Sequence, residues 1–216
     1  HMPLGADGLQ SRGFFAQLAN EIGGVVLPML FFGPDSKLET ESETFYGMDV
    51  CGDNFTGNMR YQNQKLTGSA YYIEKELFIK VLDSIVMQLN RAGFKIIVAH
   101  GHGPSIHTFS EMIPNLENKY KIRCFHAWGD FADPDEIYYG LQADHGGANE
   151  TSIMMTLDSD LVDLSKLPES LSQWPLGIGM GDPRLYANFD YGEKIVSRQI
   201  NRMKNVLTLA LKEVLE

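Results

Sequence analysis

The chain has 216 residues, 44% of them hydrophobic, and a formal net charge of −10 at pH 7. Its length fits one large domain, and its negative charge argues against a surface for nucleic-acid phosphates or anionic lipids, which favours a small molecule or another protein as the partner. No apolar run reaches the ~18 to 20 residues of a membrane span, and no signal-peptide pattern is visible, so we expect a soluble cytoplasmic protein.

Helical and strand spacing of apolar residues alternate along the chain, which is typical of an α/β fold. The predicted elements, in order, are a helix over 9–21, a short buried strand over 23–30, a polar glycine-rich segment over 33–72, a helix over 73–93, a strand over 94–99, a helix over 105–118, a strand over 121–128 and a long helix from about 191 to 216. Strands separated by helices predict a parallel sheet, which gathers ligands at the carboxyl ends of its strands.

The polar segment over 33–72 is too long to be an ordinary connection in a compact domain. We interpret it as a functional loop or an oligomer contact. Its part from 49 to 68, with Asp53, Asn54 and Arg60, and the aromatic stretch FHAWGDF at 125–131 are candidates for substrate specificity. Loop packing and subunit contacts are equally good explanations of both stretches.

The segment HGHGPS at 100–105 follows the predicted strand over 94–99, so it lies at the carboxyl edge of the predicted sheet. Its glycines allow the backbone to turn sharply and to approach a ligand closely, and a histidine there can project into the crevice. A tight turn with a solvent-exposed histidine pair is the alternative.

The segment HGGANETS at 145–152 precedes a further apolar stretch. Asn149 can cap a helix whose first turn contains Glu150, where the positive end of the helix dipole favours the ionised carboxylate. Glu150 is therefore suited to bind a cation, and His145 could face the same point across the glycine loop. A plain cap with Glu150 exposed explains the spacing equally well.

Asp7 lies in a loop just before the first predicted helix, where a lone aspartate is most often a cap or a turn residue. Taken with His102 and Glu150, however, it completes a set of two carboxylates and one imidazole from three loops. This mixture of oxygen and nitrogen donors suits Zn²⁺, Mn²⁺ or Fe²⁺. The two cysteines, Cys51 and Cys124, have no CxxC spacing and indicate neither a disulfide framework nor a thiolate site.

Three stretches together resemble the signature regions of the creatininase family of metal-dependent amidohydrolases: PLGAD at 3–7, GFKIIVAHGHG at 93–103 and HGGANETS at 145–152. The resemblance implies a single three-layer α/β/α sandwich over 1–216 with a mostly parallel central sheet. It also implies one or two divalent metal ions at the carboxyl ends of the strands, and assembly as a homohexamer.

The resemblance also implies roles for individual residues. Asp7 matches the aspartate that bridges the metals, His102 matches the metal-binding histidine, and Glu150 matches a metal ligand or catalytic carboxylate. His145 matches the histidine that contacts substrate or moves protons. The expected substrate-binding residues are His100 and Ser105, which stand where the family usually has asparagine, and Trp128.

Departures from the family pattern limit what can be carried over. The family's Glu-x-His pair, one ligand for each metal, should lie just upstream of residue 1 and is absent, so either a native segment is missing or the metal site is incomplete. Pro104 stands where creatininase has a second glutamate ligand, which makes creatinine an unlikely substrate.

The function implied is the opening of a small polar cyclic amide, or a related cyclic carbonyl compound, by water activated on a divalent metal. C–N and C–C cleavage are not separable from the sequence. The main alternative is a non-catalytic protein that keeps the fold and binds a metabolite or a partner. A nucleotide-binding domain that uses HGHGPS as a phosphate loop is weaker, because the chain is acidic and has no GxGxxG or GK[ST] motif.

Overall fold

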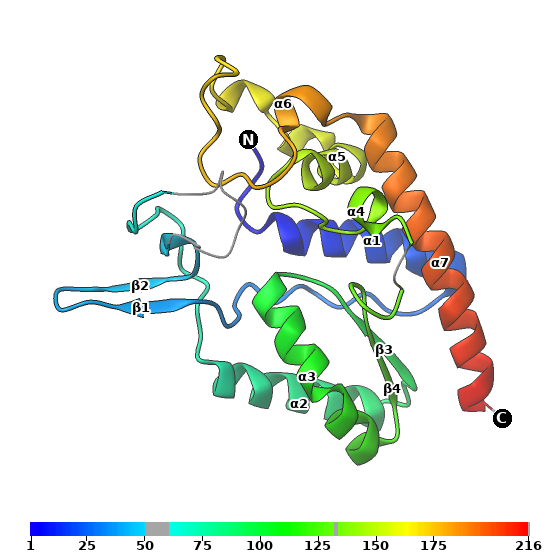
Figure 1. Ribbon diagram of the computed structural model, residues 1–216. Helices are drawn as coiled ribbons and strands as arrows, with labels where there is room; N and C mark the ends of the chain where they lie inside the picture. The colour runs from blue at the N-terminus through cyan, green and yellow to red at the C-terminus, as the bar shows by residue number, and fades with distance from the viewer. Residues whose placement is uncertain (51–60, 132–133, 216) are drawn as a thin grey trace.

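The computed structural model describes residues 1–50, 61–131 and 134–215 (Figure 1). The helices are α1 (Ala6–Ile22), α2 (Lys75–Arg91), α3 (Gly103–Tyr120), α4 (Glu136–Tyr139), α5 (Ala148–Leu157), α6 (Pro183–Tyr186) and α7 (Phe189–Leu215). The strands are β1 (Lys37–Glu39), β2 (Thr44–Tyr46), β3 (Ile96–Ala99) and β4 (Arg123–His126). Helices α1, α2, α3 and α7 and strands β3 and β4 confirm the elements predicted from periodicity.

Strands β3 and β4 pair in parallel, from Ile96 opposite Arg123 to Ala99 opposite His126. The side chains of β3 alternate between two apolar clusters, as the two-residue period of a strand requires. Ile96 and Val98 face the cluster built by α1, α5 and α7, whereas Ile97 and Ala99 face the cluster built by α2 and α3. The sheet therefore lies between two helical layers, and the α/β/α fold is confirmed.

The strand predicted over 23–30 is wrong. These residues form no regular structure, and several apolar side chains are open to solvent, with exposed fractions of 65% for Val25, 46% for Leu27 and 49% for Met29. An extended segment becomes a strand only when a neighbour accepts and donates its backbone hydrogen bonds. Among the described residues no strand pairs with this segment, since the two sheets contain only β1 with β2 and β3 with β4.

The polar segment over 33–72 contains an antiparallel hairpin. Strands β1 and β2 pair from Lys37 opposite Tyr46 to Glu39 opposite Thr44, and the hairpin projects from the body of the protein (Figure 1). The backbone N–H of Gly47 donates to the Ser36 carbonyl at 2.8 Å and closes the stem. The specificity candidates Asp53, Asn54 and Arg60 lie outside the described residues.

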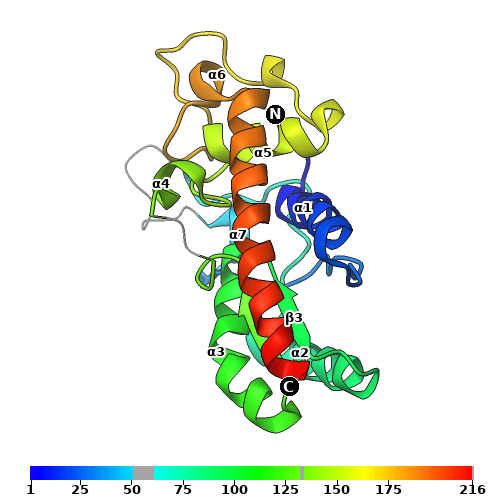
Figure 2. The same ribbon diagram turned by 90° about the vertical axis from the view of Figure 1, so that its right-hand side faces the viewer.

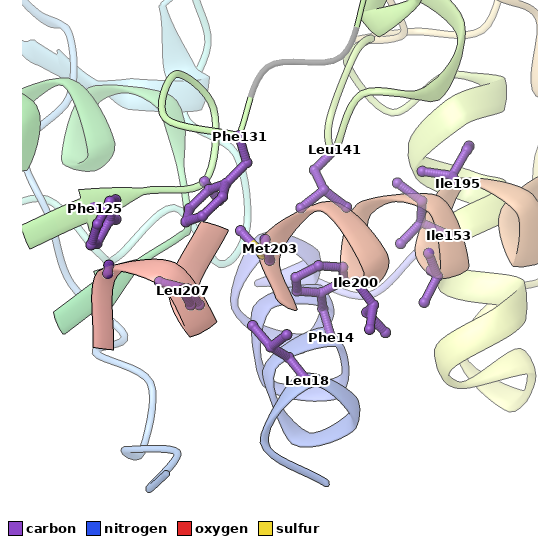
Figure 3. Close-up of a cluster of buried hydrophobic side chains, with 13 residues drawn as sticks. Phe14, Leu18, Phe125, Phe131, Leu141, Ile153, Ile195, Ile200, Met203 and Leu207 are labelled. Carbon is purple, nitrogen blue, oxygen red and sulfur yellow. The ribbon is translucent and has the colours of Figure 1, made fainter. Parts of the chain in front are cut away.

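Helix α7 runs along the molecule and joins its two ends (Figure 2). Its buried face packs on α1, α5 and β4 in the larger apolar cluster, where Phe14, Ile153, Ile195 and Met203 are almost fully buried (Figure 3). No helix in the described part of the chain combines the length and the apolar character that a membrane crossing needs.

We expect Gly192→Ala to lower the free energy of unfolding by about 1–3 kcal/mol or more, because α7 meets α5 at this point. A methyl group on Gly192 would lie 1.9 Å from the Ser152 carbonyl oxygen. Glycine to alanine inside a helix otherwise stabilises by roughly 0.5–1 kcal/mol, so the sign itself is informative. Urea denaturation measures the change.

Gly13→Ala in α1 is the matched control. A methyl group there meets only the Leu157 side chain, 3.2 Å away, which can move aside. A loss of stability at Gly192 no larger than that at Gly13 would contradict the close approach of α5 and α7.

Candidate functional site

The imidazole of His102 lies between two carboxylates. It occupies the position before α3, at the carboxyl end of β3, as its place in HGHGPS predicts. Its Nδ1 is 2.9 Å from Asp7 Oδ2, and its Nε2 is 2.8 Å from Asp35 Oδ2. Asp7 belongs to the first turn of α1, whereas Asp35 precedes the hairpin. The structure thus brings together two residues that the sequence predicts and one that it does not.

The second oxygen of Asp7 is held by a polar chain from the other side of the pocket. Gln142 Nε2 donates to Asp7 Oδ1 at 2.7 Å, and Trp128 Nε1 donates to Gln142 Oε1 at 3.1 Å. Gln142 has a φ of 54°, in the left-handed region that non-glycine residues seldom adopt. The Asn149 side chain fixes this turn, because it accepts from the Ala143 N–H at 3.0 Å and donates to the Gly140 carbonyl at 3.1 Å.

The cap predicted at Asn149 is therefore wrong. The carboxylate of Asp144 caps α5, since it accepts from the backbone N–H groups of Asn149 at 2.7 Å and Glu150 at 3.1 Å. Glu150 itself is 7% exposed, which excludes the alternative of an exposed residue, and its Oε2 accepts from the Gly146 N–H at 2.7 Å. Two carboxylates and three backbone N–H groups thus hold the loop before α5 in one conformation.

His100 is held in one tautomer. The Ser11 hydroxyl donates its proton to the Asp7 carbonyl at 2.6 Å, so the bond of 2.6 Å between Ser11 Oγ and His100 Nδ1 must be donated by the imidazole. In the neutral ring Nε2 then carries a lone pair, and this atom is buried without a hydrogen-bond partner among the described residues. Such an atom is suited to accept a hydrogen bond from a ligand.

The other predicted residues occupy the same region. Ser105, in the first turn of α3, packs on the backbone of Gly33, where an added Cβ would lie 2.2 Å from its hydroxyl. The ring of Trp128 covers Gly103 at the start of α3. His145 is tied to Gly179 through its carbonyl, which accepts the Gly179 N–H at 2.8 Å.

The electrostatics of the pocket are dominated by burial and by carboxylates. Burial alone would raise the pKa of Asp7, but the hydrogen bond and charge of His102 bring it below its usual value. Burial, and then the negative charge of Asp7, raise the pKa of Glu150 well above its usual value. Burial lowers the pKa of His145, and the opposing charge of Asp7 does not restore it. The pocket therefore holds more carboxylate groups than cationic partners.

The types of donor in this pocket fit a divalent cation. Carboxylates and imidazoles are hard and borderline ligands suited to Zn²⁺ and Mn²⁺, and the repulsion between Asp7 and Glu150 is relieved by a cation. In the described part of the chain, however, no three histidine, cysteine, aspartate or glutamate side chains are placed to hold one ion together. Both nitrogens of His102 are hydrogen-bonded to carboxylates, so an ion has to displace one of these bonds.

Sequence reasoning missed Asp35, Tyr71, Gln142, Asp144 and Ser11. Asp35 and Tyr71 fall inside the polar segment over 33–72, whose length indicates a functional loop or an oligomer contact but singles out no residue. Asp144 directly precedes HGGANETS, so an acidic residue before a glycine turn was available as a cap signal. Nothing in the sequence distinguishes Gln142 or Ser11 from ordinary polar residues.

Comparison with known proteins gives one family and one fold. The family model described as "Creatininase: Creatinine amidohydrolase" matches residues 1–203. A creatinine amidohydrolase from Pseudomonas putida is 25% identical over 174 residues, which cover 77% of this chain and 62% of that protein. The chain therefore spans less than two thirds of this curated relative.

Solved structures of creatininases share the fold. A mutant creatininase of the "Zn-Zn type" superposes with a TM-score of 0.66 at 20% identity, over 96% of this chain and 83% of that one. A structure described as "Creatininase Mn" superposes with a TM-score of 0.64 at 19% identity, over 96% and 84% of the two chains.

We expect His100 and His102 to have opposite charge states at pH 7 in chelator-treated protein. Burial lowers the pKa of His100 to about 4, so the ring is neutral at pH 7. Burial alone would also lower the pKa of His102, but the hydrogen bonds to Asp35 and Asp7 raise it to about 10, so this ring stays protonated. A ¹⁵N NMR titration of labelled histidines reads both states. A neutral His102 at pH 7 would contradict the double hydrogen bond.

Proposed function

Because this chain belongs to the creatininase family, which its match over residues 1–203 shows, we propose that it is a divalent-metal-dependent hydrolase. The proposed substrate is a small polar cyclic amide or a related cyclic carbonyl compound. The observation that carries the proposal is the meeting of Asp7 and His102, with 2.9 Å between Asp7 Oδ2 and His102 Nδ1, in a pocket that also buries Glu150. Amidohydrolase chemistry, with C–N cleavage, comes first, and C–C ring cleavage is the variant.

The proposed metal ligands are Asp7, His102 and Glu150. When bound, a divalent ion lowers the pKa of water and polarises a carbonyl, which makes amide hydrolysis possible near neutral pH. The creatininases of known structure include a Zn-Zn type and a Mn form, which supports zinc or manganese here. Iron remains a further candidate on donor chemistry alone.

The residues around these ligands are proposed to move protons and to orient the substrate. His145 is neutral at pH 7 because burial lowers its pKa, so it can accept a proton. Without a bound cation Glu150 retains a proton more readily than an exposed glutamate, and it would release this proton on binding the metal. His100 offers its unpaired Nε2 as an acceptor for a substrate N–H or O–H group, and Ser105 and Trp128 line the approach over α3.

A second candidate function is a non-catalytic protein that keeps this fold and binds a metabolite or a partner. It is favoured by the lack, among the described residues, of three side chains already placed around one ion. Retention of Asp7, His102, His145 and Glu150 in one pocket favours the hydrolase.

We also propose that copies of the chain assemble, with a homohexamer as the specific expectation from the family resemblance. The exposed apolar side chains of Val25, Leu27 and Phe31, which lie within one short segment, support a covered surface, because burying apolar surface against a second copy is favourable. Light scattering of the purified protein measures the oligomeric state, and a monomer at all concentrations would contradict this proposal.

We expect the purified protein to open small lactams or cyclic ketones only when Zn²⁺ or Mn²⁺ is present. Treatment with a chelator should abolish the activity, and the ion should restore it. His102→Ala should lower kcat/KM at least about 100-fold, since even residues that only support a metal ligand contribute 10–100-fold. Chromatography of the ring-opened product measures the rate.

Asp83→Ala is the control, because this carboxylate of α2 pairs with Lys119 of α3 at 2.9 Å and belongs to none of the segments proposed for the site. Bound metal without any ring opening across the substrate panel would favour the non-catalytic protein. Hydrolysis that persists without metal, or in His102→Ala, would exclude the proposed site.

A further inference from the structure

The carboxylate of Asp35 is held by several hydrogen bonds and contacts the His102 imidazole. Its Oδ2 lies 2.8 Å from His102 Nε2 and accepts from the Tyr71 hydroxyl at 2.6 Å. Its Oδ1 accepts from the Ser36 N–H at 2.6 Å. The side chain of Asp35 is only 10% exposed, whereas that of Asp7 is 30% exposed. Asp35 therefore takes part in three hydrogen bonds, whereas Asp7 takes part in two, with His102 and Gln142, and has the more exposed side chain.

A histidine binds a metal ion through the nitrogen that carries no proton, and its other nitrogen normally stays protonated. Ligating histidines commonly donate that remaining proton to a carboxylate, which fixes the tautomer and the ring direction. In His102, Nε2 faces Asp35, which has three hydrogen-bond partners, and Nδ1 faces the more exposed Asp7. The contacts thus suit Nε2 to keep its proton as a hydrogen-bond donor and Nδ1 to act as the metal-binding nitrogen.

We propose that Asp35 is a positioning residue that holds the Nε2 proton of His102 and leaves Nδ1 free to bind the metal beside Asp7. This inference rests on the proposed function, since it assigns a role within the same metal site. Tyr71 supports Asp35 from behind: its hydroxyl donates to the carboxylate, and its ring lies edge-on to His102 with 5.8 Å between the ring centroids.

The backbone near Asp35 leaves room for its contact with His102. Gly47, at the other end of the hairpin stem, has a φ of 53°, and a Cβ added there would lie 2.1 Å from the Tyr71 hydroxyl and 2.9 Å from Asp35 Oδ2. A side chain at position 47 would therefore push both groups away from His102. The hydrogen bond from Gly47 to Ser36 closes the stem and keeps Asp35 at the edge of the pocket.

The test is the metal affinity of Asp35→Asn and Tyr71→Phe, measured with Zn²⁺ in competition with a chromophoric chelator. Asp35→Asn should weaken Zn²⁺ binding by about 10–100-fold, and Tyr71→Phe by less, because loss of an orienting partner typically costs that much. Asp49→Asn is the matched control. Asp49 is a buried carboxylate in the turn that follows the hairpin, and it accepts from the Leu66 N–H at 2.7 Å, whereas the two nitrogens of His102 bond to Asp7 and Asp35.

A spectroscopic measurement separates positioning from a purely structural role. In Zn-loaded protein with ¹⁵N-labelled histidine, His102 should show a metal-shifted Nδ1 and a protonated, strongly hydrogen-bonded Nε2. Asp35→Ala should lose the hydrogen-bonded Nε2 proton, whereas Asp49→Asn should keep it.

The Zn²⁺ affinity of the wild-type protein tests the proposed function, and the difference between wild type and Asp35→Asn tests the positioning role of Asp35. Wild-type protein that binds Zn²⁺ while Asp35→Asn keeps its affinity would overturn the positioning role alone, as would a metal-shifted Nε2. Wild-type protein that binds no Zn²⁺ would overturn the proposed function, and the positioning role with it.

Discussion

The pair of hydrogen bonds made by the His102 imidazole is the interaction on which the site depends. It ties the first turn of α1, through Asp7, to the end of β3 and to the stem of the hairpin, through Asp35. These residues are far apart in the sequence, and the bonds are made at the carboxyl edge of a parallel sheet, where ligands of α/β proteins gather. Without His102 the buried carboxylates would face one another with no cation between them, which is costly in a desolvated pocket.

The long-range packing of the helices supports this arrangement. Helix α5 carries Glu150 at its start and Ile153 in the largest apolar cluster. The packing of Ile153 in the core therefore fixes the helix and, with it, the position of Glu150. Its close contact with α7 requires the absence of a side chain at Gly192. The stability of the core and the geometry of the site are therefore linked through one short helix.

Much of this architecture could be predicted from the sequence, because periodicity reports burial directly. Helices α1, α2, α3 and α7 and the strands β3 and β4 follow from it, and the ends of these elements place His102, whereas the short helices α4 and α6 do not follow from it. Periodicity does not report pairing, so the apolar run over 23–30 was assigned to a strand although no described strand lies beside it. Asp35 and Gln142 were missed because their importance comes from tertiary contacts, which no local pattern records.

The central claim is that a divalent metal binds between Asp7 and the Nδ1 face of His102. Anomalous diffraction at the zinc absorption edge, from crystals grown with Zn²⁺, tests it directly. The account predicts an anomalous peak bonded to His102 Nδ1 and to the Asp7 carboxylate, with Asp35 still hydrogen-bonded to Nε2. A peak on the Nε2 side, or none in this pocket, would contradict it.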